Sequence, residues 1–277
     1  MNLGIQNTNG PTPQQARAGV NKSSRVWSGT KSLKLDGSGD YIDANGAMSQ
    51  AFLRANPWTI SMWVNWDKSV ASQYFFGVDS GSNSLEFRIQ WRWVTGGGAG
   101  IFFIDGQYTS VSTGQFPTYF ADSGLGDSGM SGWKHLCITH ANASGSGDDD
   151  RMTIKYYVDA SEISSGNGAS NATQAAVTAD KDFFFGAWNN NGTLGTPATA
   201  YMTGCAIFST ALDADNVTAV YNSGTPFDLS VNHGDYNQSD KLSSYYPLED
   251  HAKDIVGTLA DATLAGDPAY DSSNIPF

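Results

Sequence analysis

Nine consecutive residues in the first quarter of the chain alternate between large apolar and smaller polar side chains. In the stretch WTISMWVNW, residues 58–66, the even positions hold Trp, Ile, Met, Val and Trp and the odd positions Thr, Ser, Trp and Asn. Successive side chains of a β-strand point to opposite faces, so this period of two predicts a strand whose even positions face the core. Trp63 is then a lone large aromatic on the polar face, which makes it a candidate ligand contact.

Similar patterns recur along the chain and define its class. Residues 85–94 place apolar side chains on one face and charged or amide side chains on the other, and residues 152–159 alternate in the same way. Counted with the shorter apolar runs between turns, the chain has about ten to fourteen strands. Thirty-one glycines, 12% aromatic residues and only 15% charged residues are typical of many short strands joined by tight turns. We therefore predict an all-β fold, a two-sheet antiparallel sandwich.

One segment departs from the strand pattern. Between Gly204 and Gly224 a short apolar strand leads into a run where apolar side chains recur every three to five residues, as on one face of a helix. Asp213 is placed to cap the N-terminus, and Gly224 to take the left-handed conformation that often follows a helix. The sequence thus predicts one short helix near residues 213–222, which plugs one end of the sandwich.

The length indicates one domain with appendages, since 277 residues with 40% apolar content can bury a sizeable core. Residues 1–30 are polar and aperiodic, and form an extended arm that is either disordered or ordered against a partner. Residues 31–225 form the sandwich. Residues 226–277 form a C-terminal extension, in which the run Lys241 to Leu248 predicts one added strand packing on the sandwich.

The charged face of the predicted strand 85–94 is a candidate ligand surface, because Arg88 and Arg92 lie on it beside an acid and an amide. The alternative is a solvated outer face with weak cross-strand ion pairs.

A second candidate is the run Trp188, Asn189 and Asn190. An aromatic ring can stack on the apolar face of a pyranose while neighbouring amides hold its hydroxyl groups. The alternative is a simple turn, since Asn191-Gly192 follows the run.

The charge balance excludes one class of partner. The formal net charge is −12 and the few Lys and Arg residues are dispersed, so we expect no nucleic-acid binding. No apolar run is long enough to span a membrane and no apolar signal segment is present, so we expect neither membrane insertion nor a secretion signal.

The two cysteines, Cys137 and Cys205, lie in apolar runs. They are either free buried thiols, which is the interpretation that we favour, or a disulfide.

Five motifs in chain order resemble the concanavalin A-like lectin/glucanase superfamily, in its laminin-G-like branch. They are SLKLDGSGDYI (32–42), WTISMWV (58–64), WKHL (133–136), IKYYVD (154–159) and the stretch Ala206 to Tyr221. The resemblance covers residues 31–224 and implies a jelly-roll sandwich. The later runs YNSGTPFDL (221–229) and KLSSYYPLED (241–250) look like versions of this domain in structural proteins of tailed phages.

The sequence departs from the hydrolases of this superfamily. Those members carry alternating carboxylates on one strand, because retaining hydrolysis needs an acid and a nucleophile about 5 Å apart. The only glutamates here, Glu86, Glu162 and Glu249, lie far apart in sequence. Where the family often has an Asp-Glu pair before the strand that begins at Ala206, this chain has Thr203–Gly204. We therefore expect no enzymatic activity.

Calcium is implied by the resemblance alone, and no other cofactor is expected. Asp36, Asp40 and Asp79 lie in predicted turns and are candidate oxygen donors, but their spacing matches no calcium-loop motif. Metal ligands are therefore left unassigned.

These observations, with the phage resemblance, predict a non-enzymatic structural protein on the surface of a virus particle, such as a capsid decoration protein. Its expected partners are other virion proteins, such as the capsid shell, and further copies of itself in a homo-oligomer. The alternative is a carbohydrate-binding adhesin or receptor-binding module that recognises host surface glycans, a role compatible with the first. A hydrolase is a third and disfavoured hypothesis.

Overall fold

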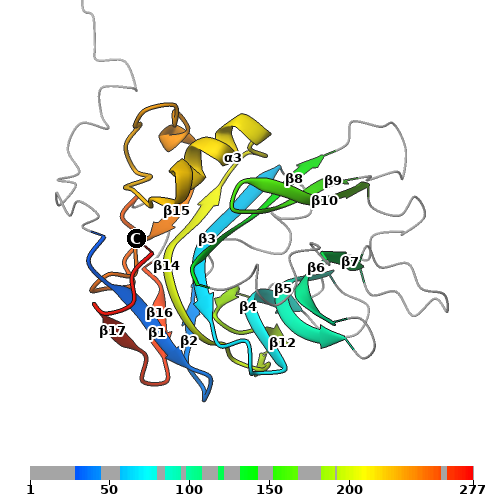
Figure 1. The fold of residues 1–277 in the computed structure, drawn as a ribbon, viewed down its shortest axis with the longest axis vertical. Helices are drawn as coiled ribbons and strands as arrows, with labels where there is room; N and C mark the ends of the chain where they lie inside the picture. Colours follow the sequence, from blue (N-terminus) through cyan, green and yellow to red (C-terminus); the bar gives the residue numbers. More distant parts are fainter. Residues whose placement is uncertain are drawn as a thin grey trace, which may run out of the picture.

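The computed structural model describes residues 29–44, 57–79, 85–94, 98–107, 118–121, 132–142, 152–167, 182–190, 192–256 and 261–276. In this part of the chain two β-sheets pack face to face, with one α-helix and two short 3-10 turns (Figure 1). The predicted all-β sandwich is confirmed.

The first sheet, sheet A, has eight strands and is antiparallel throughout. From edge to edge they are β10 (Ser161–Asn167), β9 (Met152–Val158), β8 (Lys134–Asn142), β3 (Trp58–Trp66), β14 (Thr199–Phe208), β1 (Ser32–Asp36) and β17 (Ala269–Asp271), and β15 (Leu242–Tyr246) also pairs with β14. Along one side, β14 pairs first with β1 and then with β15. The last third of the chain is therefore built into the sheet.

The second sheet, sheet B, has nine strands. From edge to edge they are β16 (Thr263–Ala265), β2 (Tyr41–Asp43), β11 (Phe184–Phe185), β4 (Ser72–Asp79), β5 (Leu85–Val94), β6 (Gly98–Gln107) and β7 (Thr118–Ala121), while β12 (Asn189–Asn190) pairs with β4 and with β13 (Thr193–Leu194). The short β12–β4 pair is parallel and the other pairs are antiparallel, so the predicted antiparallel arrangement has this one exception in the described strands.

The main core lies between the two sheets, and β3 contributes to it as its period of two predicted. Its even positions, from Trp58 to Trp66, are all buried in this core. Sheet B faces them with Phe76, Val78, Ile89 and Trp91. Burial of such side chains stabilises the fold by about 1.5–3 kcal/mol each, which makes this interface the main source of stability.

A second apolar layer, here called the cover layer, lies on the outer face of sheet A. It consists of α3 (Ala214–Tyr221) and the segment 226–245, seen beside β14 and β15 in Figure 1. Its buried side chains pack on the outward-facing residues of sheet A. The cluster comprises Cys137, Tyr157, Ala206, Phe208, Leu212, Val217, Val220, Leu229, Tyr236, Leu242 and Tyr245.

The helix prediction is confirmed in position and largely in its caps. The Asp213 carboxylate accepts a hydrogen bond from the Asn216 N–H at 2.9 Å, as an N-cap should. The helix ends at Asn222 rather than at Gly224, because Asn222 itself takes the left-handed conformation (φ 46°, ψ 49°). Asparagine tolerates this conformation better than most residues.

The C-terminal extension carries more structure than the sequence indicated. We expected one strand after residue 226, and the described part has three: β15 where it was predicted, and then β16 and β17. The last two join different sheets, since β16 pairs with β2 in sheet B and β17 with β1 in sheet A. Each has only three residues, too few for an alternating pattern to be recognisable.

Both cysteines are free and buried, as we favoured. Cys205 belongs to the main core and Cys137 to the cover-layer cluster, so they lie on opposite faces of sheet A. In the described residues, no helix has the length and apolar character needed to cross a membrane.

Candidate ligand-binding site

An arginine stacked on two aromatic rings occupies the outer face of sheet B. The Arg88 guanidinium carbon lies 4.8 Å from the ring centroid of Trp188 and 5.5 Å from that of Tyr74. The two rings are themselves 5.2 Å apart at their centroids. Arg88 and Trp188 are half-buried and Tyr74 is buried. We call these three residues the arginine platform.

Local sequence explains how Arg88 reaches the rings. Arg88 stands opposite Gly77 in the β4–β5 register, and glycine leaves the space above it open for a neighbouring side chain. A register shift between Tyr74 and Phe76 lets Tyr74 leave the core face while Phe76 stays on it. Both features favour an arginine side chain lying across β4.

The hairpin β12–β13 holds Trp188 from the other side. The Gly195 N–H donates to the Trp188 carbonyl oxygen at 2.7 Å, which closes the hairpin against the indole. A Cβ at position 195 would lie 2.8 Å from the Trp188 ring, so only glycine allows this approach. The indole orientation is therefore set by the backbone of its own hairpin.

Asn189 is a turn residue and not a ligand contact. It is buried (4% exposed), its Nδ2 donates to the Asp182 carbonyl oxygen at 2.8 Å, and its Oδ1 accepts from the Gly192 N–H at 2.7 Å. The turn alternative thus describes this residue. Asn190 is half-buried in β12, opposite Thr193, at the rim of the arginine platform's hairpin.

Trp63, predicted to contact a ligand, is buried with 5% of its surface exposed. It lies on the outer face of sheet A, as the alternation predicted, but the cover layer closes over it. Its ring lies 5.7 Å from that of Tyr221, at the end of α3, and 5.0 Å from that of His135. The prediction of a ligand contact is wrong here, because the polar face of β3 faces the helix and not solvent.

Of the predicted site residues, the structure brings Arg88 and Trp188 together and adds Tyr74, which the sequence reasoning did not select. Arg92 lies opposite Ser72 on β5, and its side chain falls outside the described part. Tyr74 could not be chosen from its own strand, because only the register between β4 and β5 places it beside Arg88.

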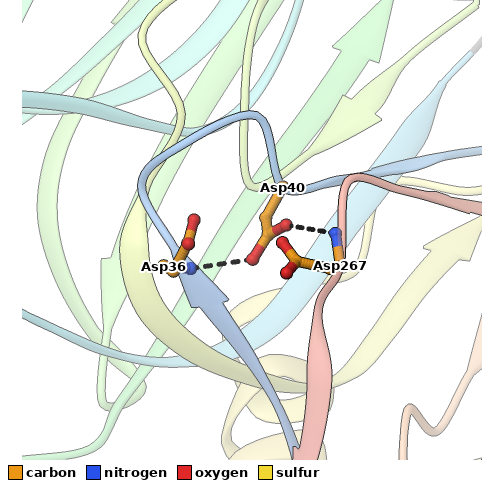
Figure 2. A group of neighbouring side chains, drawn as sticks. All are labelled: Asp36, Asp40 and Asp267. Atoms are coloured by element: carbon orange, nitrogen blue, oxygen red, sulfur yellow. Dashed lines mark hydrogen bonds between the residues drawn. The ribbon is translucent and has the colours of Figure 1, made fainter.

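A second polar feature lies where two turns that connect the sheets meet, one between β1 and β2 and the other between β16 and β17. Figure 2 shows the side chains of Asp36, Asp40 and Asp267 grouped where these turns meet, with the carboxylates of Asp40 and Asp267 side by side. One oxygen from each lies within 4.8 Å of the others. Asp36 and Asp40 were among the predicted oxygen donors, whereas Asp267 lies in the C-terminal extension and was missed. The side chain of Asp79, the third predicted donor, is outside the described part.

These oxygens fit part of a calcium shell. Two oxygens bound to one Ca²⁺ at about 2.4 Å are at most about 4.8 Å apart, and carboxylates are ligands that this ion prefers. Asp40 already has a structural role, however. It is 1% exposed, and its two oxygens accept the Asp36 N–H at 2.9 Å and the Asp267 N–H at 2.8 Å. The Asp40 carboxylate therefore has a structural role, since it joins the two turns by hydrogen bonds whether or not a cation binds.

The position where the family often has an acidic pair is structural in this chain. The Thr203 hydroxyl donates to the Pro247 carbonyl oxygen at 2.7 Å, and the Gly204 N–H donates to the same oxygen at 3.2 Å. Gly204 has φ +60°, in a bulge of β14 that packs over Trp63. These two hydrogen bonds hold the C-terminal extension against β14.

A buried Ser–His pair lies beneath the cover layer. The Ser61 hydroxyl oxygen is 2.7 Å from His135 Nε2, and both residues are at most 1% exposed. Nδ1 of His135 has no hydrogen-bond partner in the described part. Burial lowers the pKa of this imidazole to about 3, so it is neutral. Without substrate access or a carboxylate on Nδ1, the pair is suited to packing rather than to nucleophilic catalysis.

Comparisons with known proteins agree with this architecture. A laminin-G-type family model, described as concanavalin A-like lectin/glucanases superfamily, matches residues 36–218. The chain therefore belongs to the concanavalin A-like lectin/glucanase superfamily. The search of curated proteins found no match.

The chain is similar to several solved structures. A proposed carbohydrate-binding protein from Bacteroides ovatus is 13% identical with a TM-score of 0.54, and the alignment covers 88% of this chain and 60% of that one. The CBM40 module of a Ruminococcus gnavus IT-sialidase, bound to α2,3-sialyllactose, is 14% identical with a TM-score of 0.45, covering 69% and 96%. A SAP-like pentraxin from Limulus polyphemus is 10% identical with a TM-score of 0.45, covering 85% and 94%. At 13% identity the likeness to the first of these structures shows the fold alone.

Proposed function

We propose that this protein is a non-enzymatic structural protein of a bacteriophage particle, exposed on the particle surface as a capsid decoration protein or a similar component. The observation that carries the proposal is the integration of the runs 221–229 and 241–250, which look like phage versions of this domain. Leu229 and Tyr245 are buried in the cover layer, and Tyr246 and Leu248 in the main core. The phage-like runs are thus part of the folded body.

The contacts of Glu162 and Glu249 support a role without hydrolysis by these two glutamates. Glu162 forms an exposed ion pair with Lys155 at 3.2 Å, and Glu249 is buried and accepts the Thr30 N–H at 3.1 Å. These contacts are with an ammonium group and a backbone N–H, whereas retaining hydrolysis requires a second carboxylate beside the first.

Mass spectrometry of purified particles tests the proposal. The chain is expected in intact virions at a stoichiometry fixed by the lattice or fibre to which it is attached, and antibody labelling is expected on the outside of the particle. A chain present in the lysate but absent from density-purified particles would overturn it.

A second candidate function is glycan binding at the arginine platform, which is compatible with the first. The specific observation is the half-buried Arg88–Trp188 stack on the outer face of sheet B, away from the face that the cover layer occupies. Host surface glycans are the expected ligands. Aromatic and arginine side chains held rigidly at a surface are common anchors for ligands, because little rotamer freedom is lost on binding.

Glycan-array binding with and without calcium tests this candidate. Trp188→Ala is expected to abolish binding, and Tyr201→Ala, on sheet A, serves as the matched aromatic control. Thermal melting shows whether each variant is folded. Equal binding by folded Trp188→Ala and the parent protein would exclude the platform as the site.

A further inference from the structure

We propose that the end of α3 is a flap that lifts from sheet A as the pH falls and opens the buried Ser61–His135 pair to solvent. The flap is defined as residues 218–225, the last turn of α3 and the turn after it. It lies on the outer face of sheet A, in the cover layer (Figure 1). This device is independent of the glycan and virion functions proposed above.

The start of α3 is tied to sheet A by hydrogen bonds. The Thr59 hydroxyl, on β3, donates to the Thr210 carbonyl oxygen at 2.8 Å and accepts the Leu212 N–H at 2.9 Å. Both partners lie in the segment that leads into the helix, and Thr59 and Leu212 are buried. The start of the helix is therefore a fixed point about which its far end can move.

The far end of α3 is held by side-chain packing instead. In the described structure, the hydrogen bonds of the turn 222–225 stay within α3 and the turn itself. The Tyr221 ring lies 5.7 Å from that of Trp63 and 5.9 Å from that of His135. The flap thus closes on sheet A through Tyr221 and the buried Val220.

The turn that ends the flap adds conformational strain. Asn222, Ser223 and Gly224 have φ values of 46°, 54° and 91° in succession. Left-handed backbone is unfavourable for residues with a side chain, although asparagine tolerates it better than serine does. The closed position therefore holds Ser223 in a conformation that a lifted flap can leave.

The closed position makes no provision for a charge on His135. Its Nε2 lies 2.7 Å from the Ser61 hydroxyl oxygen, and its Nδ1 has no hydrogen-bond partner in the described part. The adjoining Asp159 carboxylate is engaged, since one oxygen accepts the His135 backbone N–H at 2.9 Å and the other the Lys134 ammonium at 2.6 Å. From α3, the ring is faced by Tyr221, which is neutral because burial raises its pKa. A protonated imidazole would therefore lie near an ammonium group without a free carboxylate among these neighbours.

The lifted flap gives the imidazole access to water and therefore its ordinary proton affinity. In the closed position burial lowers the pKa of His135 to about 3, against 6.5 for a free side chain. Between these values only the open form binds a proton, so opening is favoured as the pH falls below 6.5. The equilibrium constant for opening should rise about 30-fold from pH 8 to pH 5. Carboxylates of ordinary pKa, near 4, contribute little in this range.

Amide hydrogen exchange of the full chain at pH 8 and pH 5, corrected for the intrinsic exchange rate at each pH, tests the flap. Residues 218–225 report lifting, and β3 reports opening of the whole sandwich. The cysteines give a second measurement, because Cys137 lies opposite Ser61 in the cover-layer cluster and Cys205 lies in the main core. Their labelling by a disulfide reagent that reacts in acid is compared with the rate in the denatured protein at the same pH.

We expect the corrected exchange of the flap and the labelling of Cys137 to rise about 30-fold from pH 8 to pH 5, while β3 and Cys205 stay protected. His135→Gln keeps a side chain that can hydrogen-bond to Ser61 but binds no proton, so it should lose this rise. His233→Gln, the same substitution at an exposed position of the cover layer, should keep it. Circular dichroism shows whether each variant is folded.

An NMR titration of the parent protein decides the question if His135→Gln does not fold. The His135 imidazole of the closed protein is expected to stay neutral from pH 8 to pH 5. Titration of His135 near pH 6.5 without faster exchange in the flap would overturn the proposal. The same holds for an equal rise in folded His135→Gln, which would show another titrating group, and for parallel labelling of Cys137 and Cys205, which would show global unfolding.

Discussion

The Asp40 carboxylate accepts a hydrogen bond from the backbone N–H of Asp267, with 2.8 Å between Oδ1 and N, although the two residues stand 227 positions apart. The same carboxylate accepts the Asp36 N–H through its other oxygen. One buried side chain thus joins the turn after β1 to the turn before β17. A Cβ at Gly266 would overlap this carboxylate, so glycine is required at that position of the second turn.

Asp40→Ala is therefore expected to lower the free energy of unfolding by about 2–4 kcal/mol, because two partly buried N–H groups lose their acceptor. Asp40→Asn, which keeps one carbonyl oxygen, should have a smaller effect. Urea denaturation gives both values. Asp235→Ala, at an exposed loop position, is the control and should change stability by less than about 0.5 kcal/mol. An Asp40→Ala protein as stable as this control would contradict the role of Asp40 in joining the two turns.

Trp63→Ala tests the burial of this residue under α3. Truncation of a buried aromatic side chain costs about 3–5 kcal/mol, and Trp63→Phe, which keeps a ring against Tyr221, should cost less. Glycan binding by the folded fraction should be unchanged, because the residue lies on the opposite sheet from the arginine platform. Loss of binding in a stably folded Trp63→Phe protein would restore Trp63 as a ligand contact.

The lowered pKa of the buried His135 predicts that the free energy of unfolding depends on pH. Its pKa is about 3 in the folded state because it is buried, against about 6.5 in an unfolded chain. As the pH falls through 6.5 the unfolded chain binds a proton that the folded protein does not, so stability is lost from about pH 6.5 down to about pH 3. The loss attributable to this residue is a few kcal/mol at the acid end.

The measurement is the free energy of unfolding against pH for the parent and for His135→Gln. The difference between the two curves should be flat above about pH 7 and should slope below it. His233→Gln, the same substitution at an exposed position, is the matched control. A difference curve that is flat from pH 7 to pH 4 would show that His135 is accessible to protons in the folded state.

The hydrogen bonds of Asn274 predict that the segment after β17 stabilises the folded protein. Its Oδ1 accepts hydrogen bonds from Asn65 Nδ2 at 3.0 Å and from the indole N–H of Trp133 at 2.9 Å. Asn274→Ala should lower stability by about 1–3 kcal/mol and speed amide hydrogen exchange in β17 and β1. Asn274→Asp keeps the acceptor and should be milder, and Ser272→Ala is an exposed control. Unchanged exchange in β1 and β17 would contradict this role.

Much of the fold was predictable from local sequence. The alternation in residues 58–66 gave both the strand and its core face, because side-chain direction in a strand depends only on position. The helix and its N-cap followed in the same way from Asp213 and the apolar spacing behind it. These features are set by residues within a few positions of one another.

What covers a face was not predictable, because it depends on residues far away in the chain. Trp63 is on the polar face as expected, but Tyr221 buries it from a helix more than a hundred positions later. Arg88 and Trp188 were selected separately, each with an alternative, and only the sheet register brings them together with Tyr74. Asp267 lies in an irregular stretch with no motif, so nothing local pointed to its place beside Asp40.

The pairing of β1 has a consequence for the order in which the protein folds. In the described structure its two neighbours are β14 and β17, and Asp36 at its end contacts Thr199 across 163 positions. During synthesis the first strand therefore emerges from the ribosome long before either neighbour exists. Closing such long loops is slow, and an unpaired strand edge is exposed to aggregation meanwhile. The step that completes sheet A must wait until β17 (Ala269–Asp271) has been made.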